Sequence, residues 1–139
     1  MTAEYEISTE PGRLDLAKLH RWLSTDAYWA IGRSRETVAA AVRNSVNFGA
    51  YRDGVMVAFA RLVTDDATFA WLCDVYVDPA ERGRGLGRRL VAAARDHARE
   101  RGLRRIMLAT DDAHGLYAEF GFRPLAEPWK WMELRLADK

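Results

Sequence analysis

The spacing of apolar residues along the chain predicts an alternating series of strands and helices. Residues 5–8 alternate as a short strand that Pro11 and Gly12 end. Two amphipathic helices should follow, one after Asp15 and one after Ser34, because each of these side chains can accept a hydrogen bond from a backbone N–H group at a helix start. The apolar residues at helical spacing are Leu16, Leu19, Trp22 and Leu23 in the first helix, and Val38, Ala41 and Val42 in the second.

The middle of the chain has the pattern of three strands joined by tight turns. Residues 48–52 and 55–63 flank Asp53-Gly54, a pair that favours a two-residue hairpin between apolar runs. After a turn at Thr64-Asp65-Asp66, residues 69–77 form a fourth strand. We therefore expect the hairpin strands of this region to pair in antiparallel fashion.

The second half of the chain alternates between helix and strand. Gly102 suits the C-terminal cap of a helix over residues 86–101. A strand over 105–110, a short helix over 113–120 and a final strand over 132–136 complete the order. A helix between the fourth and fifth strands implies that these two are parallel, so the fold class is α/β, a mixed sheet with helices on both faces. The long helix buries a stripe of Leu86, Leu90, Ala94 and Ala98, and the last strand alternates through Met132, Leu134 and Leu136.

Composition and charge narrow the class of protein. The chain has 139 residues, enough for one domain over 1–139 with a real core, and its net charge of +1 argues against a general nucleic-acid binder. The longest apolar run, 55–60, is far too short to span a bilayer. Cys73 is the one cysteine, and the N-terminus lacks the pattern of a signal peptide. We expect a cytoplasmic protein with neither a membrane nor a nucleic acid as partner.

The stretch Arg82-Gly83-Arg84-Gly85-Leu86-Gly87 is the strongest candidate for chemistry. It follows a strand and opens a helix, where free backbone N–H groups carry partial positive charge. Glycines allow close approach of a ligand to the backbone, and arginines suit phosphate oxygens. The Walker motif needs Lys-Ser/Thr after its last glycine, where this chain has Arg88-Arg89. The dinucleotide fingerprint needs a third glycine, and its place holds Arg88 or Leu90 in the two possible alignments. The stretch therefore predicts a pyrophosphate cradle of another kind.

Two motifs resemble those of the GNAT superfamily of N-acetyltransferases. Residues 82–87 match its acetyl-CoA signature, Gln/Arg-x-x-Gly-x-Gly/Ala, and residues 110–122 match its other signature, Asn-x-x-Ala-x-x-Leu-Tyr-x-x-x-Gly-Phe, except that Thr110 stands in place of Asn. The resemblance covers nearly the whole chain. It implies a GNAT-type fold, with a central mixed sheet of six or seven strands that splay apart between strands 4 and 5.

The resemblance also implies where acetyl-CoA binds and which group is the acid. Pantetheine lies between the splayed strands, and the backbone N–H of Val75 or Tyr76 is the oxyanion donor. Tyr117 matches the general acid that protonates the leaving thiolate; a phenol with a pKa of about 10 keeps its proton at neutral pH. The cofactor-binding residues implied in this way are Val75, Tyr76, Val77, Arg82, Gly83, Arg84, Gly85, Leu86, Gly87, Arg88 and Thr110.

The base and the acceptor site are open to more than one interpretation. Asp74 shares a strand face with Leu72 and Tyr76, and it is a candidate catalytic residue as a base or as an anchor for the ammonium; the alternative is a structural carboxylate. No metal is predicted, since the three histidines and Cys73 lack the spacing of metal ligands. The candidates for substrate binding are Tyr28, Trp29, Asp111 and Trp129.

The sequence thus predicts an N-acetyltransferase that moves the acetyl group of acetyl-CoA to a primary amine, in a ternary complex. A small-molecule amine is the favoured acceptor. Protein N-termini or lysines stay open, as does a CoA-binding module without turnover, although Tyr117 argues against the latter. A homodimer is compatible with the sequence.

Overall fold

The computed structural model of the protein describes residues 4–137, which divide into two compact units. The first unit ends at Ala109 and the second begins at Thr110. The strands are β1 (Glu6–Ser8), β2 (Val46–Arg52), β3 (Val55–Thr64), β4 (Ala70–Val77) and β5 (Ile106–Met107). The α-helices are α1 (Leu16–Thr25), α2 (Arg35–Arg43), α3 (Leu86–Glu100) and α4 (His114–Ala118), and short 3-10 turns cover Pro11–Arg13, Pro79–Glu81 and Pro128–Lys130.

The sheet of the first unit has the order β1-β2-β3-β4-β5. Neighbouring strands from β1 to β4 are antiparallel, and β5 runs parallel to β4. Asp53 and Gly54 both have a positive φ in the β2–β3 turn, as a two-residue hairpin requires. Both the hairpin and the parallel pair confirm the expectations from the sequence, because the turn residues and the intervening helix α3 determine them.

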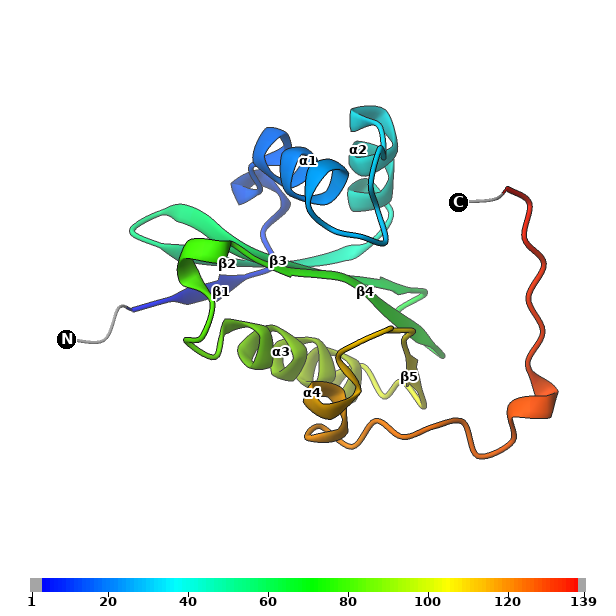
Figure 1. Ribbon diagram of the computed structural model, residues 1–139. Helices are drawn as coiled ribbons and strands as arrows, with labels where there is room; N and C mark the ends of the chain where they lie inside the picture. Colours follow the sequence, from blue (N-terminus) through cyan, green and yellow to red (C-terminus); the bar gives the residue numbers. More distant parts are fainter. Residues whose placement is uncertain (1–3, 138–139) are drawn as a thin grey trace. The chain divides into compact units, whose positions relative to one another are not determined.

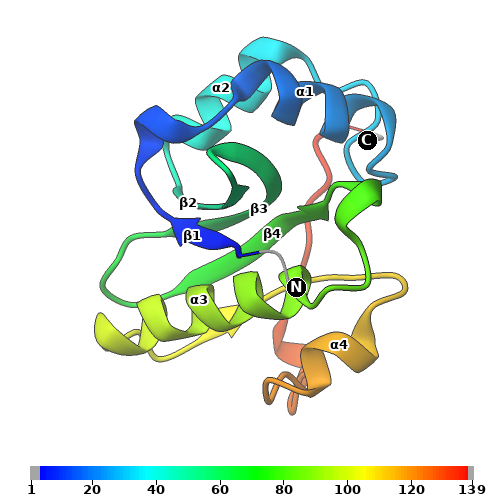
Figure 2. The same cartoon turned by 90° about the vertical axis from the view of Figure 1, so that its left-hand side faces the viewer.

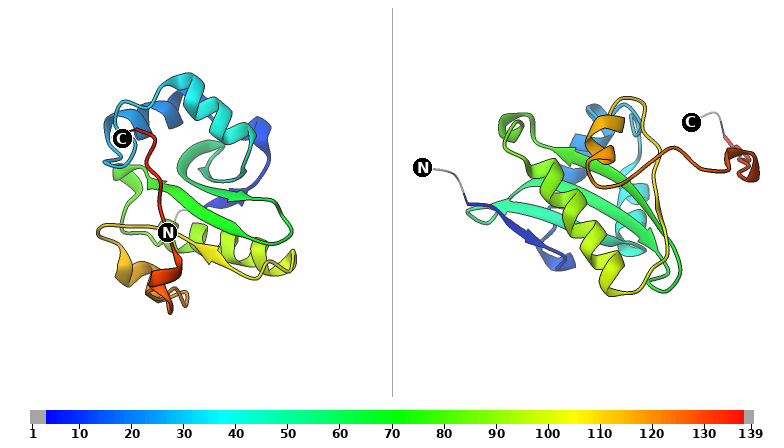
Figure 3. Two further views of the ribbon diagram at one scale, coloured as in Figure 1. Left: turned by 90° about the vertical axis from the view of Figure 1, so that its right-hand side faces the viewer. Right: turned by 90° about the horizontal axis from the view of Figure 1, so that it is seen from below.

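Helices cover both faces of this sheet. The pair α1 and α2 lies on one face and α3 lies across the other (Figures 1 and 3). Both predicted caps are confirmed: Asp15 accepts a hydrogen bond from the Lys18 N–H, and the Ser34 hydroxyl accepts one from the Thr37 N–H. Phe59 is fully buried in the core between the sheet and α1–α2. The predicted stripe of α3 is buried as well: Leu86, Leu90, Ala94 and Ala98 are each at most 3% exposed.

The sheet has fewer strands than the sequence predicts, and its fifth strand is much shorter than predicted. Of the residues described, five strands form instead of six or seven. The predicted strand over 105–110 shrinks to Ile106–Met107, and no strand forms over 132–136. Alternation gives a segment the side chains of a strand, but a strand also needs a partner for its backbone hydrogen bonds. Met132, Leu134 and Leu136 are instead 97%, 81% and 91% exposed.

None of the helices between residues 4 and 137 is long and apolar enough to cross a membrane.

Candidate active site

A β-bulge in β4 sets the geometry at the centre of the first unit. The β3–β4 register pairs Phe59 with Tyr76 and then Arg61 with Cys73, so two residues of β4, Asp74 and Val75, stand against one of β3. Asp74 has a φ of 53°, a left-handed conformation that is uncommon for a residue other than glycine. Bulges bend a strand and redirect side chains, and they are frequent beside active sites.

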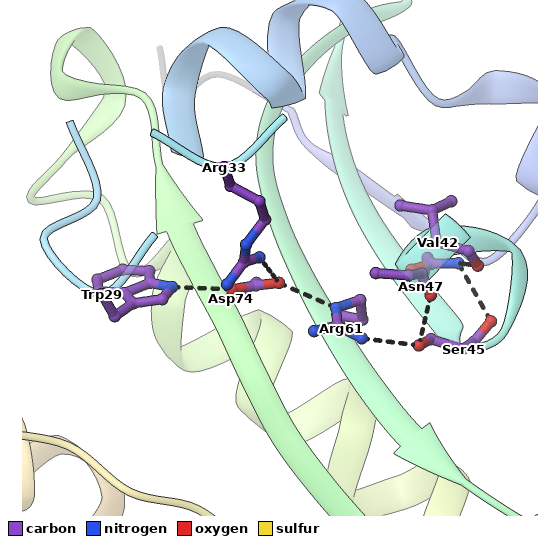
Figure 4. Close-up of polar contacts among 8 residues, drawn as sticks. Trp29, Arg33, Val42, Ser45, Asn47, Arg61 and Asp74 are labelled. Atoms are coloured by element: carbon purple, nitrogen blue, oxygen red, sulfur yellow. Dashed lines mark hydrogen bonds and ion pairs between the residues drawn. The ribbon is translucent and has the colours of Figure 1, made fainter. Parts of the chain in front are cut away.

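The carboxylate of Asp74 is buried and accepts three hydrogen bonds (Figure 4). The Trp29 Nε1–H donates to Oδ1 at 2.8 Å, and the guanidinium groups of Arg33 and Arg61 donate to Oδ2 at 2.8 and 2.9 Å. Burial acts to raise the pKa of Asp74, but the two guanidinium charges outweigh it and hold the pKa below its ordinary value. Asp74 therefore stays ionised at neutral pH, and both of its oxygens already accept hydrogen bonds, which suits a fixed anion better than a proton acceptor.

The network around Asp74 extends to neighbouring elements. Arg61 also donates from Nη1 to the Ser45 hydroxyl at 3.1 Å, which ties β3 to the end of α2. The rings of Tyr28 and Trp29 form a T-shaped pair with 5.0 Å between their centroids, and both residues stay about half exposed. The loop after α1 thus presents two aromatic rings at the edge of a charged, buried cluster.

The predicted cradle forms the turn between β4 and α3 (Figure 2). Gly83 and Gly85 have φ values of 83° and 79°, which other residues rarely adopt, so the turn itself requires glycine there. Gly87 differs, because it lies in the first turn of α3 with an ordinary φ. A Cβ atom added at Gly83, Gly85 or Gly87 would meet no atom of the chain within 4 Å. The backbone of the cradle is open to a ligand.

Two arginines of the cradle have partners within the chain. The Arg82 guanidinium donates to the carbonyl oxygen of Val77 at 2.9 Å and lies over the Tyr76 ring. Arg84 forms an ion pair with Glu81 at 3.3 Å and a hydrogen bond with the Tyr5 hydroxyl at 3.2 Å. Glu81 is only 2% exposed, so a buried carboxylate fixes the position of one cradle arginine.

The second unit contains the other predicted site residues. Tyr117 lies on α4, and its ring meets Phe122 edge to face with 5.8 Å between centroids. The Thr110 hydroxyl oxygen accepts from the backbone N–H of Ala113 at 3.1 Å, which orders the turn before α4. Its O–H group remains a donor for an acceptor outside this turn. Asp111 and Trp129 also belong to this unit, and Trp129 is 74% exposed.

The structure brings Trp29 into contact with Asp74. The sequence did not indicate the charged partners of Asp74 and Arg84. Arg33, Arg61 and Glu81 had no role assigned to them. Arg61 could have been noticed, because a charged residue inside the apolar run of β3 needs a buried counter-charge. In the cradle, Leu86 is 1% exposed, so its side chain is core and only its backbone faces the turn.

Cys73 precedes the bulge and is half-buried. Burial raises the pKa of its thiol to about 11, so the group stays protonated at neutral pH. A nucleophilic role for this cysteine therefore has no support in its surroundings.

Comparisons with known proteins identify the fold and the family of the chain. A protein of Xanthomonas campestris pv. campestris, solved as a member of the GNAT family, is 44% identical, with a TM-score of 0.92 over 98% of this chain and 96% of that one. A candidate acetyltransferase of Gibberella zeae is 29% identical over 136 residues, which cover 84% of this chain and 77% of that protein. A candidate acetyltransferase of Clostridium acetobutylicum, solved with acetyl-CoA, is 19% identical and shares the fold, with a TM-score of 0.68 over 97% of each chain.

The family model of the acetyltransferase (GNAT) family matches residues 16–122, which include the bulged strand, the cradle and Tyr117. The chain belongs to the acetyltransferase (GNAT) family.

Proposed function

We propose that this acetyltransferase moves the acetyl group of acetyl-CoA to a primary amine of a small molecule, by direct attack in a ternary complex. The binding of acetyl-CoA in this proposal rests on the presence of a glycine, Gly87, in the first turn of α3. A glycine at the start of a helix costs up to about 1 kcal/mol relative to alanine. The chain gives no steric reason for it, since a Cβ atom there would meet nothing within 4 Å. A ligand that closes on the backbone, such as the pyrophosphate of acetyl-CoA, supplies the reason.

The bulge in β4 supports a position for the acetyl-CoA thioester beside Val75. Val75 has no partner in the register of β3, because it lies in the bulge, and the ladder with β5 stops at Trp71. Its backbone N–H is therefore our candidate for the donor to the oxyanion, with Tyr76 as the neighbouring alternative. In the proposed step the amine nitrogen bonds to the carbonyl carbon, the carbon–sulfur bond breaks, and the thiolate takes the hydroxyl proton of Tyr117. The amine gives up its own proton to a base or to water.

The surroundings of Asp74 support a role as organiser of the acceptor side. Its charge is already shared by Arg33 and Arg61, and its lowered pKa leaves little tendency to accept a proton. We therefore assign Asp74 to holding Trp29 and the two arginines in place. Tyr28 and Trp29 would then contact the apolar part of the amine, and the proton of the ammonium would leave through water.

An acetyl-transfer assay with a panel of small amines tests the proposal. Release of the CoA thiol is followed with a thiol reagent, and the acetylated amine is identified by mass. We expect turnover with at least one small primary amine. Binding of CoA without turnover on any small amine or peptide would instead favour the CoA-binding module. Turnover only on peptide N-termini or lysines would favour a protein acetyltransferase.

A further inference from the structure

The C-terminal segment 131–136 presents apolar side chains to solvent with the pattern of a strand. Met132, Leu134 and Leu136 are 97%, 81% and 91% exposed and alternate with Trp131, Glu133 and Arg135. Soluble proteins rarely leave such a row of large aliphatic side chains uncovered, and a contiguous apolar patch marks an interaction site. The 3-10 turn Pro128–Lys130 precedes this segment, and no proline interrupts 131–136, so these residues can adopt the extended pairing of a strand.

The first unit carries an incomplete surface of matching character at β5. Its ladder with β4 consists of Ala70 with Ile106 and Trp71 with Met107, and β5 is the last strand of the sheet order. Ile106, Met107 and Leu108 are only partly buried, whereas the residues of β3 from Met56 to Ala60 are all buried. Beside them, Phe69 and Trp71 are 39% and 36% exposed. An open edge with apolar neighbours is a template for another strand.

We infer that 131–136 pairs as an additional strand with the β5 edge of a second copy of this chain, and that the second copy returns its own segment. Each copy then gains the strand that its five-stranded sheet lacks. One sequence contains both the apolar strand and the apolar edge, so the exchange closes as a two-fold dimer. Such exchange of an identical element is a low-cost route to a dimer.

The area and charge of the two surfaces fit this partner. A stable interface buries about 800 Å² per partner. The segment contributes Met132, Leu134 and Leu136, each more than 80% exposed, to the apolar part of such an interface, and the β5 side contributes Phe69 and Trp71, which are 39% and 36% exposed. The net charge of +1 per chain gives little repulsion between two copies. The polar face of the segment, Glu133 and Arg135, stays toward solvent.

Sedimentation of the full chain over a range of concentrations tests the inference, with two matched variants. Leu134→Asn and Glu133→Asn place the same polar side chain on the apolar and the polar face of the segment. We expect a wild-type dimer whose dissociation constant rises at least tenfold in Leu134→Asn and changes little in Glu133→Asn. Leu134 is exposed in the single chain, so the variant should keep the melting temperature of the dissociated protein.

Amide hydrogen exchange separates strand pairing from other contacts. Amides of residues 106–108 and 131–136 should be protected where the dimer dominates and exchange faster on dilution. A wild-type protein that is monomeric at all concentrations would overturn the inference. So would a dimer that survives Leu134→Asn, equal weakening by both variants, or a dimer in which these amides stay unprotected.

Discussion

Arg61 and Asp74 form an ion pair, Nε to Oδ2 at 2.9 Å, although the register of the sheet sets Arg61 opposite Cys73. Adjacent residues of a regular strand point to opposite faces. The bulge at Asp74 removes that restriction and lets the carboxylate turn toward Arg61 and Arg33. The irregularity of β4 and the buried charge cluster are therefore one feature of the fold.

Asp74→Asn should lower both stability and activity. The change leaves two guanidinium groups without their counter-charge, and breaking a buried ion pair costs on the order of 3–5 kcal/mol. Asn tolerates a positive φ, so the backbone conformation survives. Urea unfolding and kcat/KM for the amine measure the effect. Asp66→Asn is the matched control, since Asp66 also has a positive φ and ion pairs but lies more exposed. Equal unfolding free energies for the two variants would contradict the role given to Asp74.

The pKa of Asp74 predicts a specific loss of stability in acid. Its folded-state pKa lies below the unfolded value of about 3.9, so its contribution is present above that pH and is lost as the pH falls through the folded pKa. Melting temperatures measured between about pH 8 and pH 2 should fall steeply only below about pH 4. The fall should be smaller in Asp74→Asn. A change in melting temperature centred near neutral pH and abolished in Asp74→Asn would show that the pKa of Asp74 is raised in the folded protein and not lowered.

Gly87→Ala should separate folding from cofactor binding. Alanine favours the helix by up to about 1 kcal/mol, so the melting temperature should stay level or rise. The added methyl group would meet the pyrophosphate, so calorimetry should show CoA affinity at least tenfold weaker. Gly12→Ala is the control, because Gly12 also has open space and an ordinary φ. Unchanged affinity in a folded Gly87→Ala protein would remove the cradle interpretation.

Arg82→Ala should weaken CoA binding by roughly 1–3 kcal/mol, as the loss of a charge-assisted hydrogen bond does. Arg84→Ala should weaken it less, because the charge of Arg84 is shared with the buried Glu81, whereas the carboxylate that pairs with Arg82, that of Asp26, is exposed to solvent. Titration calorimetry compares the two with Arg43→Ala, an exposed arginine at the end of α2. The opposite ranking of Arg82 and Arg84 would show that the ion pair with Glu81 opens when CoA binds.

Tyr117→Phe should reduce kcat by about 10²–10⁴, the usual effect of removing a placed acid. Phenylalanine keeps the ring contact with Phe122, so the variant should stay folded, and its CoA affinity should change little. Single-turnover measurements keep product release from masking the effect. A full single-turnover rate in this variant would mean that water or another donor protonates the thiolate.

The parts of the fold that depend on short-range chemistry could be predicted from the sequence. Asp15 and Ser34 cap helices through contacts three residues away, and Asp53-Gly54 closes the hairpin on its own. The strand over 132–136 could not be predicted in the same way. Its alternation is correct for a strand, but pairing depends on a partner that no local pattern specifies.

In the candidate site, too, the contiguous motif could be predicted from the sequence and the contacts between distant residues could not. The cradle is a contiguous motif, so its glycines could be read directly from the sequence. The partners of Asp74 are 13 residues away in Arg61 and 41 residues away in Arg33. Only the bulge, which the apolar pattern of β4 does not reveal, brings these side chains together.

The high pKa of Cys73 has a practical consequence for measuring the reaction. At pH 8, a thiol with a pKa of about 11 is deprotonated in about one molecule in a thousand. Cys73 is the chain's one cysteine and is half-buried, so the enzyme itself should react slowly with a disulfide reagent. A colorimetric thiol reagent can therefore be present throughout turnover, and product formation can be recorded continuously against a low protein background.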